Sequence, residues 1–306
     1  MRDIRTDMAV EIRENLPERQ EGVQCEERET EAGLKLTWVK IQSQEGARAM
    51  GKPMGNYLTL ETRQLEEVTP RQRAEFAREI GSELKKMMTE DGNTRPVLII
   101  GLGNRDVTPD ALGPKVCEQV FVSRHIKEHL PEAIDSRAGS VCAIAPGVLG
   151  VTGLETFEVV KGIVEEVHPG LVIAIDALAA RKTSRIGTSV QIADTGIAPG
   201  AGIGNHRRAL SRETLGVKVI GIGVPMVAYA GTIAGDILEN ALGASADAAD
   251  MEQLLGAVYA AKGGELIVTP KNIDFLVDKT AELLAKALNT ALHPTISEEE
   301  IRAFME

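Results

Sequence analysis

Three aspartates of this chain each lie at or soon after the end of a short apolar segment. Asp110 lies in "GLGNRDVTPDALGPK", Asp176 follows "LVIAI", and Asp194 follows "SVQIA". Two carboxylates that converge repel each other, so one keeps its proton while the other ionises. Such a pair can activate water with one oxygen and protonate a leaving amide with the other. If Asp110 and Asp176 meet, the predicted chemistry is amide hydrolysis without a metal or a nucleophilic side chain.

Each aspartate also has a structural interpretation. Thr108 and Pro109 suit the start of a helix whose macrodipole Asp110 would complement. Asp176 has apolar neighbours, and an N-cap role or an ion pair with Arg181 would make its burial tolerable. Asp194 opens the glycine-rich segment "DTGIAPGAGIGN", which is either a surface loop or a loop that faces a substrate. These residue patterns leave the alternatives open.

The elements that must position the aspartates follow an α/β pattern. From Pro96 onward, short apolar runs alternate with helical segments, which predicts a mostly parallel central sheet with flanking helices. Reacting groups gather at the carboxyl ends of the strands of such sheets. Helices are expected over 70–88, 153–169, about 231–261 and 272–293, with a short last helix begun by Ser297 and capped by Glu300.

The N-terminal part of the chain is richer in strand signals. Residues 21–42 predict a hairpin with its turn at 31–33, and residues 55–62 alternate like a further strand. We therefore expect a small β-rich portion over about 21–62. The first 20 residues are polar and are expected to lie outside the main core.

Composition excludes several classes of protein. The net charge of −11 over 306 residues disfavours direct nucleic-acid binding and an anionic membrane surface. No apolar run reaches membrane-spanning length, and the first residues lack the apolar stretch of a secretory signal. The three cysteines are far apart and form no CxxC pair, which is typical of reduced thiols. A soluble cytoplasmic protein is the expectation.

Motifs for other chemistries are incomplete. Gly101 and Gly103 begin a dinucleotide fingerprint, but its third glycine would fall at Asp106, and neither GxxxxGK[ST] nor GxSxG occurs. His125 and His129 have helical spacing without the glutamate of HExxH, so surface positions are expected. Neither a metal nor a cofactor is expected.

Several longer motifs together carry a resemblance to a known family. "GLGNRDVTPDALGPK", "APGVLGVTGLET", "AIDALAARK", "QIADTGIAPGAGIGN", "IVTPKNIDFLVD", "RTDMAVE" and "GKPMGNYLTLE" occur across most of the chain. In these motifs the chain resembles the germination proteases of endospore-forming bacteria. One departure is the short, alanine-rich connection at about 240–262, where many relatives have a longer segment.

The resemblance implies an atypical aspartic-type endopeptidase of the spore core, without a cofactor, which degrades small acid-soluble spore proteins. It implies a fold similar to that of hydrogenase-maturation endopeptidases. It assigns the catalytic pair to Asp110 and Asp176. Asn104, Arg181 and Asp194 are expected to bind the substrate or to support that pair. It also implies a homotetrameric zymogen that removes its own short propeptide.

The segment "TDMAVE" has the layout of the sites that this family cuts, which is an acidic residue, a large apolar residue, alanine and a further acid. We therefore expect self-cleavage between Asp7 and Met8, with a propeptide of residues 1–7 and a single protease domain of residues 8–306. The alternative is that this segment is only a frayed, polar terminus.

Two other functions remain open at the level of the sequence. A metal-dependent hydrogenase-maturation type of endopeptidase shares the GxGN loop and a later aspartate at a strand end. A non-catalytic phosphate- or nucleotide-binding module would use Gly101 and Gly103 alone.

Overall fold

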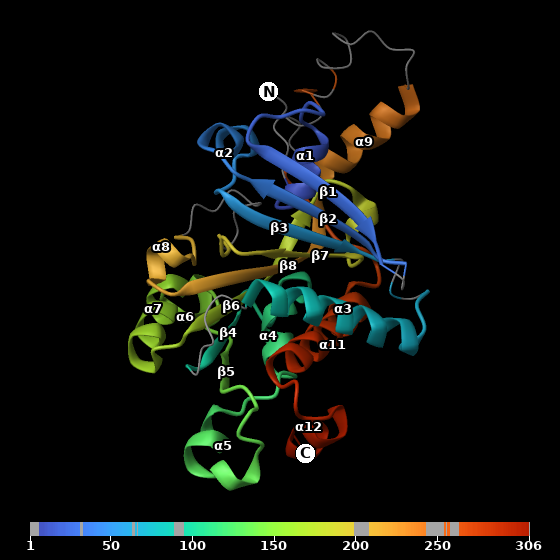
Figure 1. Ribbon diagram of the computed structural model, residues 1–306. Helices are drawn as coiled ribbons and strands as arrows, with labels where there is room; N and C mark the ends of the chain where they lie inside the picture. Colours follow the sequence, from blue (N-terminus) through green and yellow to red (C-terminus); the bar gives the residue numbers. More distant parts are fainter. Residues whose placement is uncertain are drawn as a thin grey trace.

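The computed structural model describes residues 6–30, 33–62, 65, 67–88, 95–198, 208–242, 254, 256–257 and 263–305. Within these residues the strands form one sheet in the order β1-β2-β3-β7-β8-β6-β4-β5, with β9 paired to β8 (Figure 1). The strands are β1 Val23–Glu29, β2 Lys35–Ile41, β3 Gly55–Glu61, β4 Val97–Gly101, β5 Val141–Ile144, β6 Leu171–Ala180, β7 Ser189–Ala193, β8 Lys218–Tyr229 and β9 Ile267–Val268.

Helices cover both faces of this sheet. The α-helices are α1 Ala9–Glu14, α2 Gln44–Met50, α3 Pro70–Met88, α4 Leu112–Cys117, α5 Arg124–His129, α6 Leu149–Thr152, α7 Thr156–Val167, α8 Arg212–Leu215, α9 Ala230–Leu242, α11 Ile273–Leu292 and α12 Glu298–Met305. Three short 3₁₀ turns are η1 Thr108–Asp110, η2 Pro131–Ala133 and η3 Thr183–Arg185.

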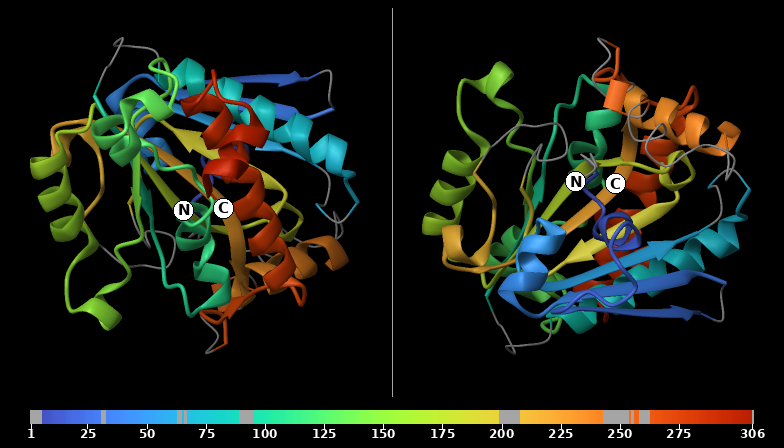
Figure 2. Two further views of the ribbon diagram at one scale, coloured as in Figure 1. Left: turned by 90° about the horizontal axis from the view of Figure 1, so that it is seen from below. Right: turned by 90° about the horizontal axis from the view of Figure 1, so that it is seen from above.

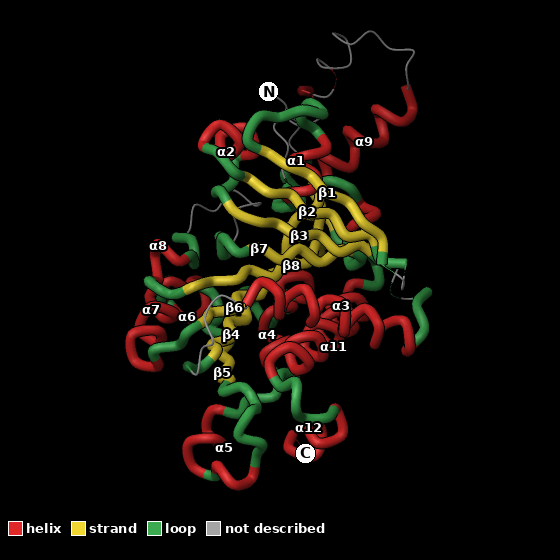
Figure 3. The backbone as a smooth tube through the Cα atoms, viewed as in Figure 1, coloured by secondary structure: helices red, strands yellow, loops and turns green. Residues whose placement is uncertain are grey.

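The sheet has a parallel half and an antiparallel half. Strand β6 runs parallel to β4 and β8, and β4 runs parallel to β5, whereas β1, β2, β3, β7 and β8 pair antiparallel in succession. Figure 3 shows the strands as one continuous band. The α/β fold is as expected from the sequence. The β-rich portion at about 21–62 extends the same sheet, because β3 pairs antiparallel with β7.

Alternation along β6 divides the core between the two faces of the sheet. Ile173 and Ile175 pack with residues of α3, α4 and α11, while Val172 and Ala174 pack with residues of α7. Figure 2 shows α3 and α11 side by side on one face. By the same alternation, Asp176 lies on the second face.

Most predicted elements form where expected. Helix α3 spans the predicted 70–88, and α12 begins with the predicted reciprocal cap, in which Ser297 Oγ accepts from the Glu300 N–H and Glu300 Oε2 accepts from the Ser297 N–H. The predicted hairpin forms as β1 and β2, although 31–32 of its turn lie outside the described residues. The predicted helical region at 231–261 begins as α9, and most of 243–262 lies outside the described residues.

The expectation that the first 20 residues lie outside the core is wrong for the segment that begins at Thr6. Met8 and Ala9 are 0 % exposed and Val10 is 2 % exposed. Ala9 packs with Val39 and Tyr57, and Met8 and Val10 pack with Leu178. Residues 8–10 are a short apolar stretch among polar neighbours. They pack against the sheet at the start of helix α1, which is why they are buried.

Among the described residues, none of the helices combines the length and the apolar composition needed to cross a bilayer.

Candidate active site

The loop after β4 is folded around the Asp110 carboxylate. Asp110 Oδ2 accepts a hydrogen bond of 2.6 Å from the Asn104 main-chain N–H. Gly103 has φ +110, and a Cβ built on it would lie 2.0 Å from the Asp110 carbonyl oxygen. Only glycine allows both this backbone conformation and this close approach. The glycine-rich start of the loop therefore serves to place Asp110.

A 3₁₀ turn begins at Thr108, where the structural interpretation had placed the start of a longer helix. Residues Thr108–Asp110 form the separate 3₁₀ turn η1, and α4 begins only at Leu112, with no side-chain cap. The main-chain N–H of Asp110 donates to the Val107 carbonyl at 2.8 Å, which closes the tight turn before the helix. Asp110 is therefore held by its own loop, outside the first turn of α4.

Gly103→Ala is expected to reduce proteolytic activity by about a hundredfold, because a misplacement of about 1 Å at a reacting group has that effect. The added methyl group must push the Asp110 main chain away. The measurement is the cleavage rate together with the thermal unfolding midpoint. Gly162→Ala is the control, since its new methyl group meets nothing within 4 Å. Equal activity of both variants would show that the loop tolerates the displacement.

Asp176 lies inside a strand, where the sequence suggested a strand end. Strand β6 continues to Ala180, and Asp176 is 6 % exposed. Strand β4 ends at Gly101 opposite Ile175, so Asp176 is the first residue of β6 beyond the end of β4. Its Oδ1 accepts the Ala177 N–H at 3.0 Å. The carboxylate therefore lies at the carboxyl edge of the parallel half, although its own strand runs on.

The two aspartates come from neighbouring elements. Turn η1, which carries Asp110, contacts β6 and β8, and β6 carries Asp176. Helix α11 packs on the same turn. The catalytic pair itself stays a prediction, which the arrangement of these elements favours.

The segment Thr6–Met8 is bound to the end of β6, at Ala179, three residues beyond Asp176. The Asp7 N–H donates to the Ala179 carbonyl at 3.0 Å, and Asp7 Oδ2 accepts the Ala179 N–H at 2.9 Å. The Thr6 hydroxyl accepts the Met8 N–H at 3.0 Å and donates to Glu11. The frayed-terminus interpretation is therefore wrong for residues from Thr6 onward.

Glu11 anchors this segment although it is 0 % exposed. Its carboxylate accepts the main-chain N–H groups of Arg181 at 2.6 Å and Lys182 at 2.8 Å. The Arg185 guanidinium lies 3.4 Å from Glu11 and pairs with Glu14 at 2.7 Å. Burial raises the pKa of Glu14, but hydrogen bonds from Arg185 and Lys182 outweigh it and lower the pKa to about 2. Mild acid therefore leaves the Glu14 pairs ionised.

Arg181 and Asp194 have structural partners. The Arg181 guanidinium donates to Asn15 Oδ1 at 2.5 Å and to Asp236 Oδ1 at 3.2 Å, so it ties α1 to α9. Asp194 accepts the main-chain and side-chain N–H groups of Asn56 at 2.8 and 2.6 Å, which joins the end of β7 to β3. These contacts are structural, and a role of either residue in supporting the catalytic pair or in binding substrate stays a prediction. Residues 199–207 of the glycine-rich segment lie outside the described residues.

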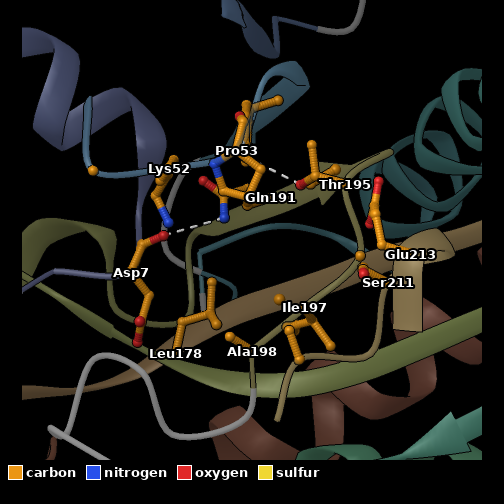
Figure 4. A pocket seen from close by; sticks show the side chains of 17 residues that line it. Asp7, Lys52, Pro53, Leu178, Gln191, Thr195, Ile197, Ala198, Ser211 and Glu213 are labelled. Atoms are coloured by element: carbon orange, nitrogen blue, oxygen red, sulfur yellow. Dashed lines mark hydrogen bonds between the residues drawn. The ribbon is translucent and has the colours of Figure 1, made fainter. Parts of the chain in front are cut away.

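A cavity of about 230 Å³ lies next to the N-terminal segment (Figure 4). Asp7, Lys52 and Gln191 line it, together with Gly221 and Gly223 of β8. Of these residues, only Asp7 was expected from the sequence to lie at a functional site. The alternating glycines of "VIGIGVP" were the available signal, because glycine in a strand interior marks a close approach to the backbone.

Other reactive groups in the described residues are less suited to catalysis. Burial raises the pKa of the Cys117 thiol to about 12, so it stays protonated and a poor nucleophile near neutral pH. Within the part of the chain that the structure describes, no three His, Cys, Asp or Glu side chains lie together in a way that could hold a metal ion.

Comparison with known proteins identifies the family. The model of a peptidase family described as germination protease matches residues 2–246 and 240–305. A germination protease of Clostridium perfringens is 40 % identical over all of both chains. Those of Caldanaerobacter subterraneus and Bacillus cereus are 42 % and 38 % identical, and the alignments cover 99 % and 98 % of this chain and 98 % and 96 % of theirs.

The α/β fold and the peptidase match define the class of protein, which is a protease. The chain belongs to the germination protease family. Its alignment with the Bacillus cereus relative spans 356 positions, more than its own 306 residues, so that relative has segments that this chain lacks. The two matched stretches meet at about 240–246, where the sequence indicated a shortened connection.

Proposed function

We propose that this protease is an endopeptidase of the spore core that starts the degradation of small acid-soluble spore proteins during germination. Membership of the germination protease family supports this proposal, as do the names of the relatives. The substrate class comes from the resemblance described above.

For the mechanism we propose an aspartic pair. The observation that carries it is a buried carboxylate, Asp176, on a strand that the Asp110 turn contacts. One carboxylate removes a proton from water, which attacks the peptide carbonyl, and the other carboxyl group donates a proton to the leaving amine. Asn104 supports the pair through the hydrogen bond from its N–H to Asp110.

The same loop gives little support to phosphate binding. A phosphate cradle needs main-chain N–H groups that point at the ligand. The Asn104 N–H instead donates to Asp110, and the Asp106 N–H donates to Asn104 Oδ1 at 3.0 Å. The carboxylate takes the place that an anion would need.

We further propose that the chain is made as a homotetrameric zymogen that cuts itself between Asp7 and Met8. Residues 1–7 would then be the propeptide and residues 8–306 the protease domain. The hydrogen bonds between Asp7 and Ala179 support this, because they hold the bond to be cut on the strand that carries Asp176.

Two steps test the function. The purified chain is held at mildly acidic pH and its N-terminus is sequenced; the expected new start is Met8, and a start that stays at Met1 contradicts self-processing. The processed protein is then incubated with a purified small acid-soluble spore protein, with and without added nickel. Cleavage without nickel is expected, and cleavage only with nickel would favour the hydrogenase-maturation type. Light scattering of the intact chain tests the tetramer.

A further inference from the structure

Gln191 brackets Met8 with both ends of its side-chain amide, and one of the two hydrogen bonds reaches the Asp7–Met8 peptide group. Its Nε2 donates to the Asp7 carbonyl oxygen at 3.3 Å, and its Oε1 accepts the Ala9 N–H at 2.7 Å. Figure 4 shows the first of these bonds crossing the cavity. Gln191 is 8 % exposed. The contact is therefore made in a site from which most water is excluded.

Strand register places Gln191 and Asp176 on opposite sides of one glycine. Gly223 of β8 is the register partner of Asp176 on β6 and also of Gln191 on β7. Register partners point to the same face of a sheet, so both side chains rise from the face that carries α1. Gly223 has no side chain, and the Leu178 side chain packs over it, since a Cβ built on Gly223 would lie 2.4 Å from Leu178 Cδ1. The row therefore has a carboxylate on one side and an amide donor on the other, and Leu178, which packs over its glycine, also packs with Met8.

Lys52 lines the same cavity as Asp7 and Gln191. Its ammonium points toward Asp7 (Figure 4) and lies over the Tyr57 ring, 5.8 Å from the ring centroid. The Tyr57 hydroxyl donates to the Pro53 carbonyl at 2.9 Å, which holds the loop that carries Lys52. Burial lowers the pKa of Lys52, while the charge of Asp7 raises it, so the two residues interact electrostatically.

We propose that Gln191 and Lys52 stabilise the oxyanion that forms on the Asp7 carbonyl oxygen when the chain cuts itself between Asp7 and Met8. The proposal rests on the self-processing proposed above, and adds the two groups that would make it efficient. Donors already aimed at the oxygen need no reorganisation as charge develops on it, and they act strongly in a site that excludes water.

The proposed reaction is hydrolysis of the Asp7–Met8 peptide bond. A water oxygen bonds to the Asp7 carbonyl carbon, and its proton passes to the ionised carboxylate of the aspartic pair. The carbonyl oxygen becomes an anion that Gln191 Nε2 and the Lys52 ammonium stabilise. The C–N bond then breaks, and the protonated carboxyl group of the pair supplies a proton to the Met8 nitrogen. The products are the Asp7 carboxylic acid and the Met8 amine.

The test uses Gln191→Glu in the full-length chain. Glutamate keeps an oxygen acceptor for the Ala9 N–H but loses the amide donor to the Asp7 carbonyl. The expected first-order rate of self-cleavage, followed by intact mass, falls by about a hundredfold to a thousandfold, as when one oxyanion donor is removed elsewhere. Lys52→Met, which keeps the length of the side chain without its charge, is expected to slow the reaction by at least about tenfold.

The control is Gln119→Glu, since Gln119 Nε2 also donates to a main-chain carbonyl, that of Lys115 at 3.2 Å, on α4 far along the chain. Hydrogen exchange of residues 9–14 reports whether α1 stays anchored in each variant. Wild-type processing rates in Gln191→Glu and Lys52→Met would overturn the proposal. A slow rate accompanied by loss of protection in α1 would also overturn it, because the effect would then be structural.

The variant Asp176→Asn distinguishes a failure of the oxyanion proposal from a failure of the proposed function. If the wild type processes, Asp176→Asn does not, and the Gln191 and Lys52 variants behave as wild type, the oxyanion assignment alone fails. If Asp176→Asn processes normally, the aspartic pair fails whatever the Gln191 variant does.

Discussion

Asp176→Asn is expected to slow both self-cleavage and substrate cleavage by about 10³- to 10⁴-fold, with the protein still folded. Asparagine has the shape of aspartate but can neither accept a proton from water nor donate one to an amine, and general acid–base groups contribute on this scale. Asp176 is 6 % exposed, so bulk water cannot easily replace its function. Asp110→Asn is expected to have an effect of the same order.

A variant with both substitutions is a stricter test of the aspartic pair. Residues that act as a unit in catalysis are strongly non-additive, so Asp110→Asn combined with Asp176→Asn should be little slower than either alone. The rates are measured by intact mass and by gel assay, with circular dichroism as the check on folding. Asp135→Asn is the control, because Asp135 pairs with Arg137 on the surface. Activity of either single variant close to that of the wild type contradicts the aspartic pair.

Glu11→Ala is expected to lower the free energy of unfolding at pH 7 by about 3–5 kcal/mol, the usual cost of removing one partner of a buried ionic network. The substitution leaves the Arg181 and Lys182 N–H groups without their acceptor and removes a buried negative charge beside Arg185. It also opens a cavity under α1. Urea denaturation followed by circular dichroism measures the change.

Glu14→Gln provides the matched comparison. The Glu14 side chain is 33 % exposed, so its ion pairs with Arg185 and Lys182 contribute less than the contacts of Glu11. Its folded-state pKa of about 2 lies below the ordinary glutamate pKa of 4.5. The contribution is therefore fully present above about pH 4.5 and is lost as the pH falls toward 2. A Glu11 effect no larger than that of Glu14 would show that α1 is only loosely held.

Local patterns in the sequence were enough to predict the α/β class and most of the helices. Helix α3 spans its predicted range and α12 begins with its predicted cap, because periodicity and caps act between residues a few positions apart. Asp110 and Asp176 could be selected for a similar reason. A carboxylate beside an apolar strand has a desolvation cost that requires an explanation wherever the strand lies.

The tertiary structure decided which of these residues have partners. In the sequence, Asp194 looked equivalent to the other two aspartates. The pairing of β7 with β3 places it beside Asn56, whose main-chain N–H donates to its carboxylate. The N-terminal segment looked polar, yet Glu11 finds its hydrogen-bond donors on residues 181–185, far along the chain. Such contacts depend on register between distant strands, which short-range patterns do not encode.

By itself, then, the sequence determined the class of fold, the two candidate carboxylates and the family motifs around them. Only the tertiary structure decided that Gln191, Gly223 and Asp176 form one row across three strands, with Asp7 held above β6. The physical reason is that neither Gln191 nor Gly223 stands out among its own neighbours, and the residues around Asp176 do not encode which strands pair with β6. Their chemistry arises from strand pairing, which brings together side chains that the sequence keeps apart.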